Sequence, residues 1–130
     1  MNLKYGFGKT VQCSFDDALA GVTAALQKEG FGILSDIDVA ATLKKKLGED
    51  MPPYRILGAC NPPLAHKAVM AEPSIGLLLP CNVVVRQDAS GTVHVEVMNT
   101  EAVLQLVDKP EIAALAQDVR QRLDRVLAAL

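Results

Sequence analysis

The sequence contains no tryptophan, and only two tyrosines and three phenylalanines among its 130 residues. Its hydrophobic core must therefore be built from aliphatic side chains. The same scarcity removes the aromatic platforms on which proteins stack the bases of single-stranded nucleic acid. An excess of positive charge is also missing, because the formal net charge is -2 and the pI is about 5.6. These two absences argue against nucleic acid as a partner.

Long hydrophobic runs are missing as well. The most apolar stretch, residues 75–85, is interrupted by Pro80 and Asn82 and is shorter than the roughly 20 residues that span a bilayer. Residues 1–6 lack the apolar segment of a signal peptide. Three cysteines, an odd number, fit a reducing compartment better than a disulfide framework. We therefore expect a cytoplasmic protein without a membrane segment.

The sequence does contain enough hydrophobic material for one core. Half of its residues are hydrophobic and 22 % are charged, which is typical of a globular chain rather than a disordered one. A length of 130 residues predicts a single domain over residues 1–130.

Hydrophobic periodicity predicts five strands and four helices. Apolar residues recur at every second position in the strands and at every third or fourth position in the helices. The longest helical stripe runs from Ile112 to Leu130, and Asp108 with Glu111 resembles a capping box at its start. The expected strands are residues 3–12, 31–38, 54–60, a stretch within 77–86, and 92–99, and the expected helices are residues 15–29, 39–47, 62–72 and 109–130.

The position of the fourth strand in the sheet depends on a proline within its apolar run. Its unbroken apolarity predicts burial on both faces. Because a proline cannot donate to a strand ladder, we expect an edge position or a bulge at Pro80, or a strand that begins after it.

The element order is β-α-β-α-β-α-β-β-α. This order predicts a two-layer α+β domain, in which a mostly antiparallel sheet is covered on one face by the long helices. The other face must meet solvent or a second copy of the chain. We expect a homodimer that packs sheet to sheet or through residues 54–85.

The residues that could bind a ligand or react lie where the third strand meets the third helix. Cys60 is expected at the strand end, and Asn61 is expected to cap a helix that begins with Pro62. Unpaired N–H groups at a helix start favour a thiolate and can hold an anion. Cys81 approaches Cys60 only if their strands are neighbours. With His66 on the same helix, the candidate ligand-binding residues are Cys60, Asn61, His66 and Cys81.

Two classes of function remain open for these residues. The preferred one is a non-catalytic ligand-binding or protein-interaction domain, with any small ligand lying between the sheet and the helices near Cys60. No catalytic residue is assigned, because no third group orients a Cys60–His66 pair. The alternative is a thiol- or metal-dependent function, redox or soft-metal, at Cys60, His66 and Cys81, possibly with Cys13. The spacing C-x5-H-x14-C matches no usual zinc pattern, and no cofactor can be named.

Three other polar groups are assigned structural roles. Lysines 44–46 are interpreted as a solvated helix face rather than an anion site. Asp36 and Asp38 could bind a cation, but acids between a strand and a helix more often serve as caps. His94 and Glu96 share the outward side of the fifth strand and are interpreted as a polar face rather than a site or an interface.

Two runs resemble a known family. Residues 57–62, Leu-Gly-Ala-Cys-Asn-Pro, and residues 76–81, Gly-Leu-Leu-Leu-Pro-Cys, are similar to the prokaryotic family called domain of unknown function 302 (DUF302). Residues 5–11, 29–34 and 37–39 are similar to it too, so the resemblance covers nearly the whole chain. It implies an α+β fold grouped with TATA-binding-protein-like folds, with a curved antiparallel sheet and helices on one side. It implies neither DNA binding nor catalytic residues, because fold does not carry function and the family has no established activity.

Overall fold

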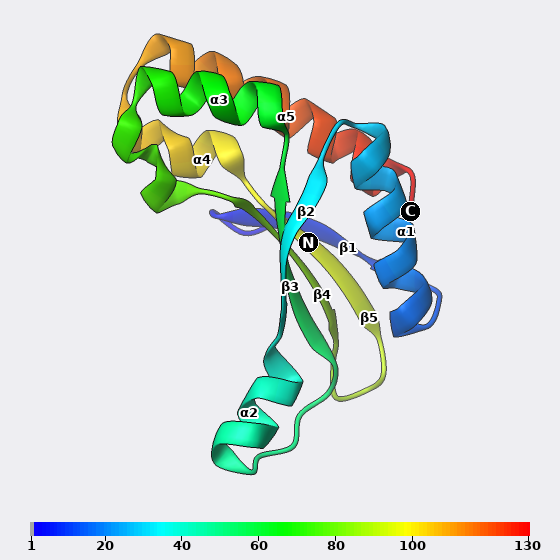
Figure 1. Ribbon diagram of the computed structural model, residues 1–130. Helices are drawn as coiled ribbons and strands as arrows, with labels where there is room; N and C mark the ends of the chain where they lie inside the picture. The colour runs from blue at the N-terminus through cyan, green and yellow to red at the C-terminus, as the bar shows by residue number, and fades with distance from the viewer. Residues whose placement is uncertain (1) are drawn as a thin grey trace.

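The computed structural model describes residues 2–130 as an open sheet with helices packed against it (Figure 1). The strands are β1 (Gly6–Val11), β2 (Gly32–Asp38), β3 (Tyr54–Cys60), β4 (Cys81–Gln87) and β5 (Val93–Met98). The helices are α1 (Phe15–Lys28), α2 (Val39–Leu47), α3 (Pro62–Ala71), α4 (Thr100–Leu104) and α5 (Pro110–Ala128), with short 3-10 turns η1 (Pro73–Leu78) and η2 (Gln105–Val107).

The five strands form one antiparallel sheet in the order β1-β5-β4-β3-β2. Together with the order of the elements and the long C-terminal helix α5, this sheet confirms the predicted α+β fold. Within residues 2–130, no helix combines the length and the hydropathy needed to cross a bilayer.

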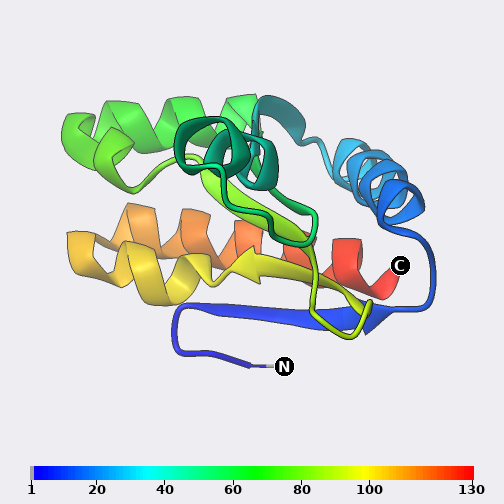
Figure 2. The ribbon, with the colours of Figure 1, turned by 90° about the horizontal axis from the view of Figure 1, so that it is seen from below.

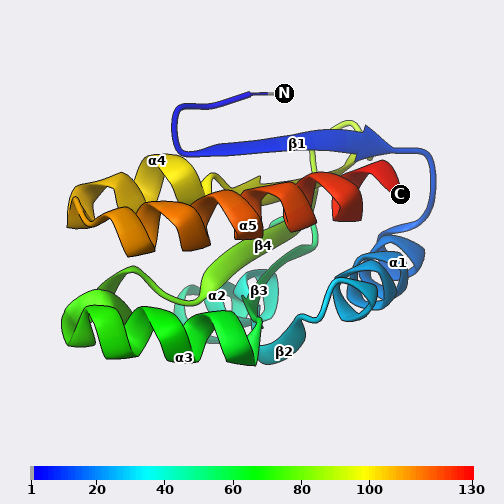
Figure 3. The same cartoon turned by 90° about the horizontal axis from the view of Figure 1, so that it is seen from above.

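The main core lies between the sheet and helices α1 and α5, which Figure 3 shows on the same side of the strands. Val83 pairs with Val97 and Val85 pairs with Val95 across β4 and β5, and all four side chains are buried on that side. Alternation along these strands therefore produces one buried face and one open face.

A second, smaller core lies between α3, η1, α4 and α5. Figure 2 shows α3 and α5 running side by side away from the sheet. Ile75 of η1 and Ile112 of α5 are buried here, and buried Thr100 donates a hydrogen bond to the carbonyl of Ala116 over 2.9 Å. The first core and this one meet along α5.

Helix α2 lies beyond the end of the sheet, away from the other helices (Figure 1). Asp38 caps it by accepting from the amide of Ala41 over 2.9 Å, and Gly48 ends it with a φ of 71°. Its three lysines are exposed, as predicted, and Lys44 forms an ion pair with Asp50 over 2.9 Å.

The fourth strand begins after Pro80, which is one of the three possibilities predicted from the sequence. Residues 73–78 form η1, and β4 starts at Cys81. The prediction that it is buried on both faces is wrong, because helices cover only one side of the sheet. Val84 is therefore half-buried on the open face, while its neighbours Val83 and Val85 are buried.

Two further local predictions need correction. Strand β1 starts at Gly6 rather than at residue 3, and Gly8 in this strand lies where β1 and β5 approach each other closely. A Cβ on Gly8 would lie 2.9 Å from the Cα of Glu96 and would overlap the carbonyl oxygen of Val95. In β2, a bulge between Ile33 and Ser35 breaks the expected alternation.

The start of α5 contains no capping box. Asp108 adopts a left-handed conformation with a φ of 56°, and Lys109 occupies the cap position. The Lys109 side chain instead donates to the carbonyl oxygen of Ala71, 2.9 Å away. Pro110 is the first helical residue, where its missing N–H costs nothing.

Candidate functional site

The chain turns from sheet into helix at Cys60, Asn61 and Pro62, as predicted from the sequence. Strand β3 ends at Cys60 and α3 begins at Pro62. The Asn61 side chain is buried and accepts from the amide of Leu64 over 3.4 Å, which caps α3. Its amide nitrogen donates to the carbonyl oxygen of Glu29, also over 3.4 Å.

Glu29 joins three helices at this junction. Its carbonyl oxygen also accepts from Arg122 Nη1 over 2.9 Å, and its carboxylate accepts from Arg125 Nε over 2.9 Å. The hydrogen bond from Arg125 lowers the pKa of the Glu29 carboxyl group. The end of α1, the start of α3 and the C-terminal half of α5 are therefore held together next to Cys60 and Asn61.

A cavity of about 280 Å³ lies beside this junction, between β3, β4, α3, α4 and α5. Among the described residues that line it, none carries a charge, and Asn61, Cys60 and Cys81 supply its only polar or sulfur-containing side chains. The lining residues are Phe31, Leu34, Ala59, Cys60, Asn61, Leu64, Ala65, Ala68, Leu79, Pro80, Cys81, Leu104, Leu115 and Val119.

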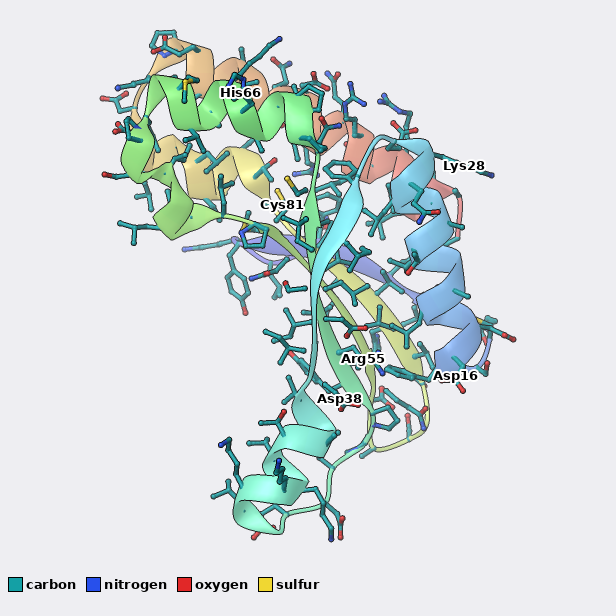
Figure 4. All side chains as sticks on the ribbon, viewed as in Figure 1. Asp16, Lys28, Asp38, Arg55, His66 and Cys81 are labelled. Carbon is teal, nitrogen blue, oxygen red and sulfur yellow. The ribbon has the colours of Figure 1, made fainter. Side chains whose placement is uncertain are left out.

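The two cysteines of the cavity lie on neighbouring strands. Cys81 pairs with Ala59, the residue before Cys60, so the condition for their approach is met. Figure 4 shows Cys81 near the base of α3, where β4 begins. Burial, with a smaller contribution from nearby Cys60, raises the pKa of Cys81 to about 11. Cys60 is half-buried, and the three cysteines, all within the described chain, are free.

His66 lies apart from these thiols. It is exposed on α3 (Figure 4), outside the cavity lining, whereas Leu64 and Ala68 of the same helix line the cavity. Cys13 is exposed beyond the end of β1. Within residues 2–130, no three His, Cys, Asp or Glu side chains gather where they could hold a metal ion. The structure thus brings together Cys60, Asn61 and Cys81, but not His66.

The two acidic side chains at the end of β2 both form ion pairs with an arginine. Arg55 Nη2 lies 2.6 Å from an Asp36 carboxylate oxygen, and Arg55 Nη1 lies 3.7 Å from Asp38 (Figure 4 labels Arg55 and Asp38). The hydrogen bond from Arg55 lowers the pKa of Asp36. Asp38 also caps α2, so the interpretation of this pair as structural is confirmed for Asp38.

The open face of the sheet carries a second hollow, of about 560 Å³, which the sequence did not indicate. An ion pair lies within it, with Arg86 Nε 2.6 Å from Glu96 Oε1. Glu96 is therefore on the outward side of β5, as predicted, but it is paired rather than solvated. The lining residues are Leu3, Tyr5, Gly6, Phe7, Tyr54, Asn82, Val84, Arg86, Glu96, Val97, Met98 and Val103.

His94 also lies outward on β5, and it belongs to the adjacent turn. Its Nε2 lies 2.8 Å from a carboxylate oxygen of Asp88, whose other oxygen accepts from the amides of Ser90 and Thr92. The bonds to His94 and Ser90 lower the pKa of Asp88. These contacts fix the β4–β5 turn, a structural role that needs no ligand.

Comparison with known proteins covers the whole fold. Residues 7–130 match the family described as "Domain of unknown function DUF302". No curated protein matches the chain. Among solved structures, the uncharacterized conserved protein DUF302 from Bacillus stearothermophilus has a TM-score of 0.88 and 27 % sequence identity, covering 96 % of this chain and 97 % of that chain.

Proposed function

Because the chain belongs to the DUF302 family, whose description assigns no activity, we propose a function from the cavity itself. The protein is a non-catalytic binding domain that holds a small, uncharged and largely apolar ligand between β3, α3 and α5. The observation that carries this proposal is the uncharged cavity beside the capped start of α3. Its position agrees with the ligand site expected from Cys60 and Asn61.

The chemistry of the walls determines what the cavity would accept. Burying a charged group among apolar side chains is costly unless a partner is present, and the described lining offers none. The amide of Asn61 is already used in capping α3 and in binding Glu29. A cavity of roughly 150 Å³ with similar walls can hold benzene in another protein. A volume of about 280 Å³ therefore suits one or two rings.

Titration with toluene, a neutral aromatic probe, tests this proposal. Amide shifts in an NMR spectrum should be concentrated between Cys60 and Ala68. Replacing the lining residue Ala65→Phe should weaken toluene binding by at least about tenfold, because the added ring fills the space. Met70→Phe is the matched control, since Met70 is on the same helix but is exposed and outside the lining. Equal binding by both variants, or shifts elsewhere, would overturn the proposal.

The domain is also proposed to act as a homodimer in the cytoplasm. The support for a dimer is the sheet face that the helices leave open, which carries exposed Tyr5 and the second hollow. Three free cysteines support the reducing compartment. Sedimentation at micromolar concentration should give a dimer, and a clean monomer would remove this proposal.

A further inference from the structure

The hollow on the open sheet face gathers aromatic side chains in a chain that has few of them. Both tyrosines of the sequence, Tyr5 and Tyr54, line it, and Tyr5 is 66 % exposed. Val84 and Met98 add aliphatic surface. Ligand pockets of roughly 300–1,000 Å³ combine such walls with a few polar groups, and this hollow measures about 560 Å³. Among the described residues, none lines both this hollow and the cavity beside Cys60.

The ion pair in the hollow keeps unused hydrogen-bonding groups. Arg86 Nε lies 2.6 Å from Glu96 Oε1, and both side chains line the hollow and remain partly exposed. Within residues 2–130, Arg86 Nη1 and Nη2 and Glu96 Oε2 make no hydrogen bond. The pair therefore offers free donors next to a free acceptor. A ligand group that presents a carbonyl oxygen beside an N–H would satisfy both.

The same pair determines which charge the hollow accepts. The charges of Arg86 and Glu96 cancel, so the site has no net charge to attract an ion. A ligand carboxylate would be attracted by Arg86 but repelled by Glu96, and an ammonium group would meet the reverse. A neutral amide avoids both repulsions and keeps the charge-assisted hydrogen bonds.

The hollow is long enough to hold a ring beside an amide group. Asn82, Val84 and Arg86 alternate along β4, share its open face and all line the hollow. At about 3.4 Å per residue, Asn82 and Arg86 are roughly 13 Å apart along the strand. Val84 lies between them, is half-buried, and is directly across from Glu96. Its apolar surface is therefore next to the free groups of the ion pair.

We propose that this hollow is a second ligand site, which binds a flat, neutral aromatic amide. The ligand carbonyl accepts from Arg86, the ligand N–H donates to Glu96, and the ring lies against Val84 and the tyrosines. A ring packed on a tyrosine gains more than its buried area alone provides. The site goes beyond the cavity proposed above and does not rest on it or on the homodimer.

NMR titrations with benzamide and with benzoate test this site. Amide shifts caused by benzamide should be concentrated in β4 and β5, between residues 82–86 and 96–98. Benzamide should bind at least about tenfold more tightly than benzoate, because Glu96 repels the carboxylate. N,N-dimethylbenzamide keeps the ring and the carbonyl but has no N–H to donate, so it should also bind more weakly than benzamide.

The variant Glu96→Gln should reverse the preference, because it leaves Arg86 with an unpaired positive charge that attracts benzoate. Glu111→Gln is the matched control. It removes the same charge, but Glu111 is exposed on α5 and outside the described lining, so the preference should not change. Val84→Phe leaves the ion pair in place and fills the hollow, so it should weaken benzamide binding by at least about tenfold. Circular dichroism checks that each variant is folded.

The outcomes separate this site from the other proposals. No binding of benzamide, tighter binding of benzoate by the wild type, or an unchanged preference in folded Glu96→Gln would overturn it. Benzamide shifts confined to residues 60–68, or full benzamide binding by folded Val84→Phe, would also overturn it. The toluene titration decides separately on the cavity beside Cys60, and sedimentation decides on the homodimer.

Discussion

The two thiols that line the cavity have different surroundings, and their reactivity should differ accordingly. Cys81 is only 7 % exposed and has a pKa of about 11, whereas Cys60 is half-buried. Since the thiolate is the reactive form, Cys81 is poorly suited to act as a nucleophile near neutral pH. At the scale of single residues, the pair therefore fits the wall of a binding cavity better than a redox or metal site.

Alkylation with iodoacetamide should reveal this difference. We expect exposed Cys13 to react first and Cys81 last, with the rate at Cys81 rising only as the pH approaches about 11. Mass spectrometry of the digested protein measures each rate separately. If Cys81 or Cys60 reacted faster than free cysteine at neutral pH, the thiol-dependent alternative would be favoured instead.

The Cys81 thiol should also make the folded protein less stable at high pH. The folded-state pKa of Cys81 is raised from its ordinary 9.0 to about 11, so the folded protein holds this proton more tightly. The contribution of Cys81 to the free energy of unfolding is complete below about pH 9 and is lost as the pH rises through about 11. Between pH 8 and pH 10 the loss should be about 1 kcal/mol in urea unfolding. The variant Cys81→Ala should show a pH dependence smaller by that amount.

At the scale of elements, the junction of β3 and α3 depends on Asn61. Its side chain caps α3 and also binds the carbonyl of Glu29 at the end of α1. Asn61→Ala should therefore lower the free energy of unfolding by about 2 kcal/mol. Asn99→Ala, which removes the cap of the short helix α4, should cost about 1 kcal/mol. Urea unfolding compares the two, and equal losses would contradict the second role of Asn61.

The elements that the sequence predicted well have local causes. The start of α3 follows from the pair Asn61 and Pro62, because an Asn cap and a first-turn proline both act within a few residues. The proline at position 80 left three possibilities for β4, and the structure has the strand begin after it, because Ile75, Leu78 and Leu79 pack against the second core instead of joining the sheet. The bulge in β2 arises from pairing with β3, which local sequence does not encode.

The candidate site was predicted in part for the same reasons. Cys60, Asn61 and Cys81 line one cavity because the strand-to-helix turn and the pairing of β3 with β4 place them there. His66, a candidate ligand-binding residue from the sequence, is exposed and outside the cavity lining, because it lies two positions along α3 from inward-facing Leu64. The hollow on the open face could not be predicted, because its lining residues come from segments that are distant in the sequence. Only the folded sheet brings those segments together.

At the scale of the whole molecule, a dimer makes stability depend on concentration. The midpoint of thermal unfolding should rise as the protein concentration is raised, because mass action favours the associated folded state. Calorimetry over a hundredfold range of concentration measures this midpoint. A wild-type midpoint that does not move would contradict the dimer.

The two margins of the sheet also limit how far association can go. At β2 the bulge between Ile33 and Ser35 interrupts the row of backbone groups that an incoming strand would need. At β1 the chain returns on itself, so that Asn2 bridges to Phe7 along the outer margin. Neither margin is a continuous template for strand addition. We therefore expect association to stop at a closed dimer rather than propagate into filaments. This limit protects the Val-rich sheet from aggregation.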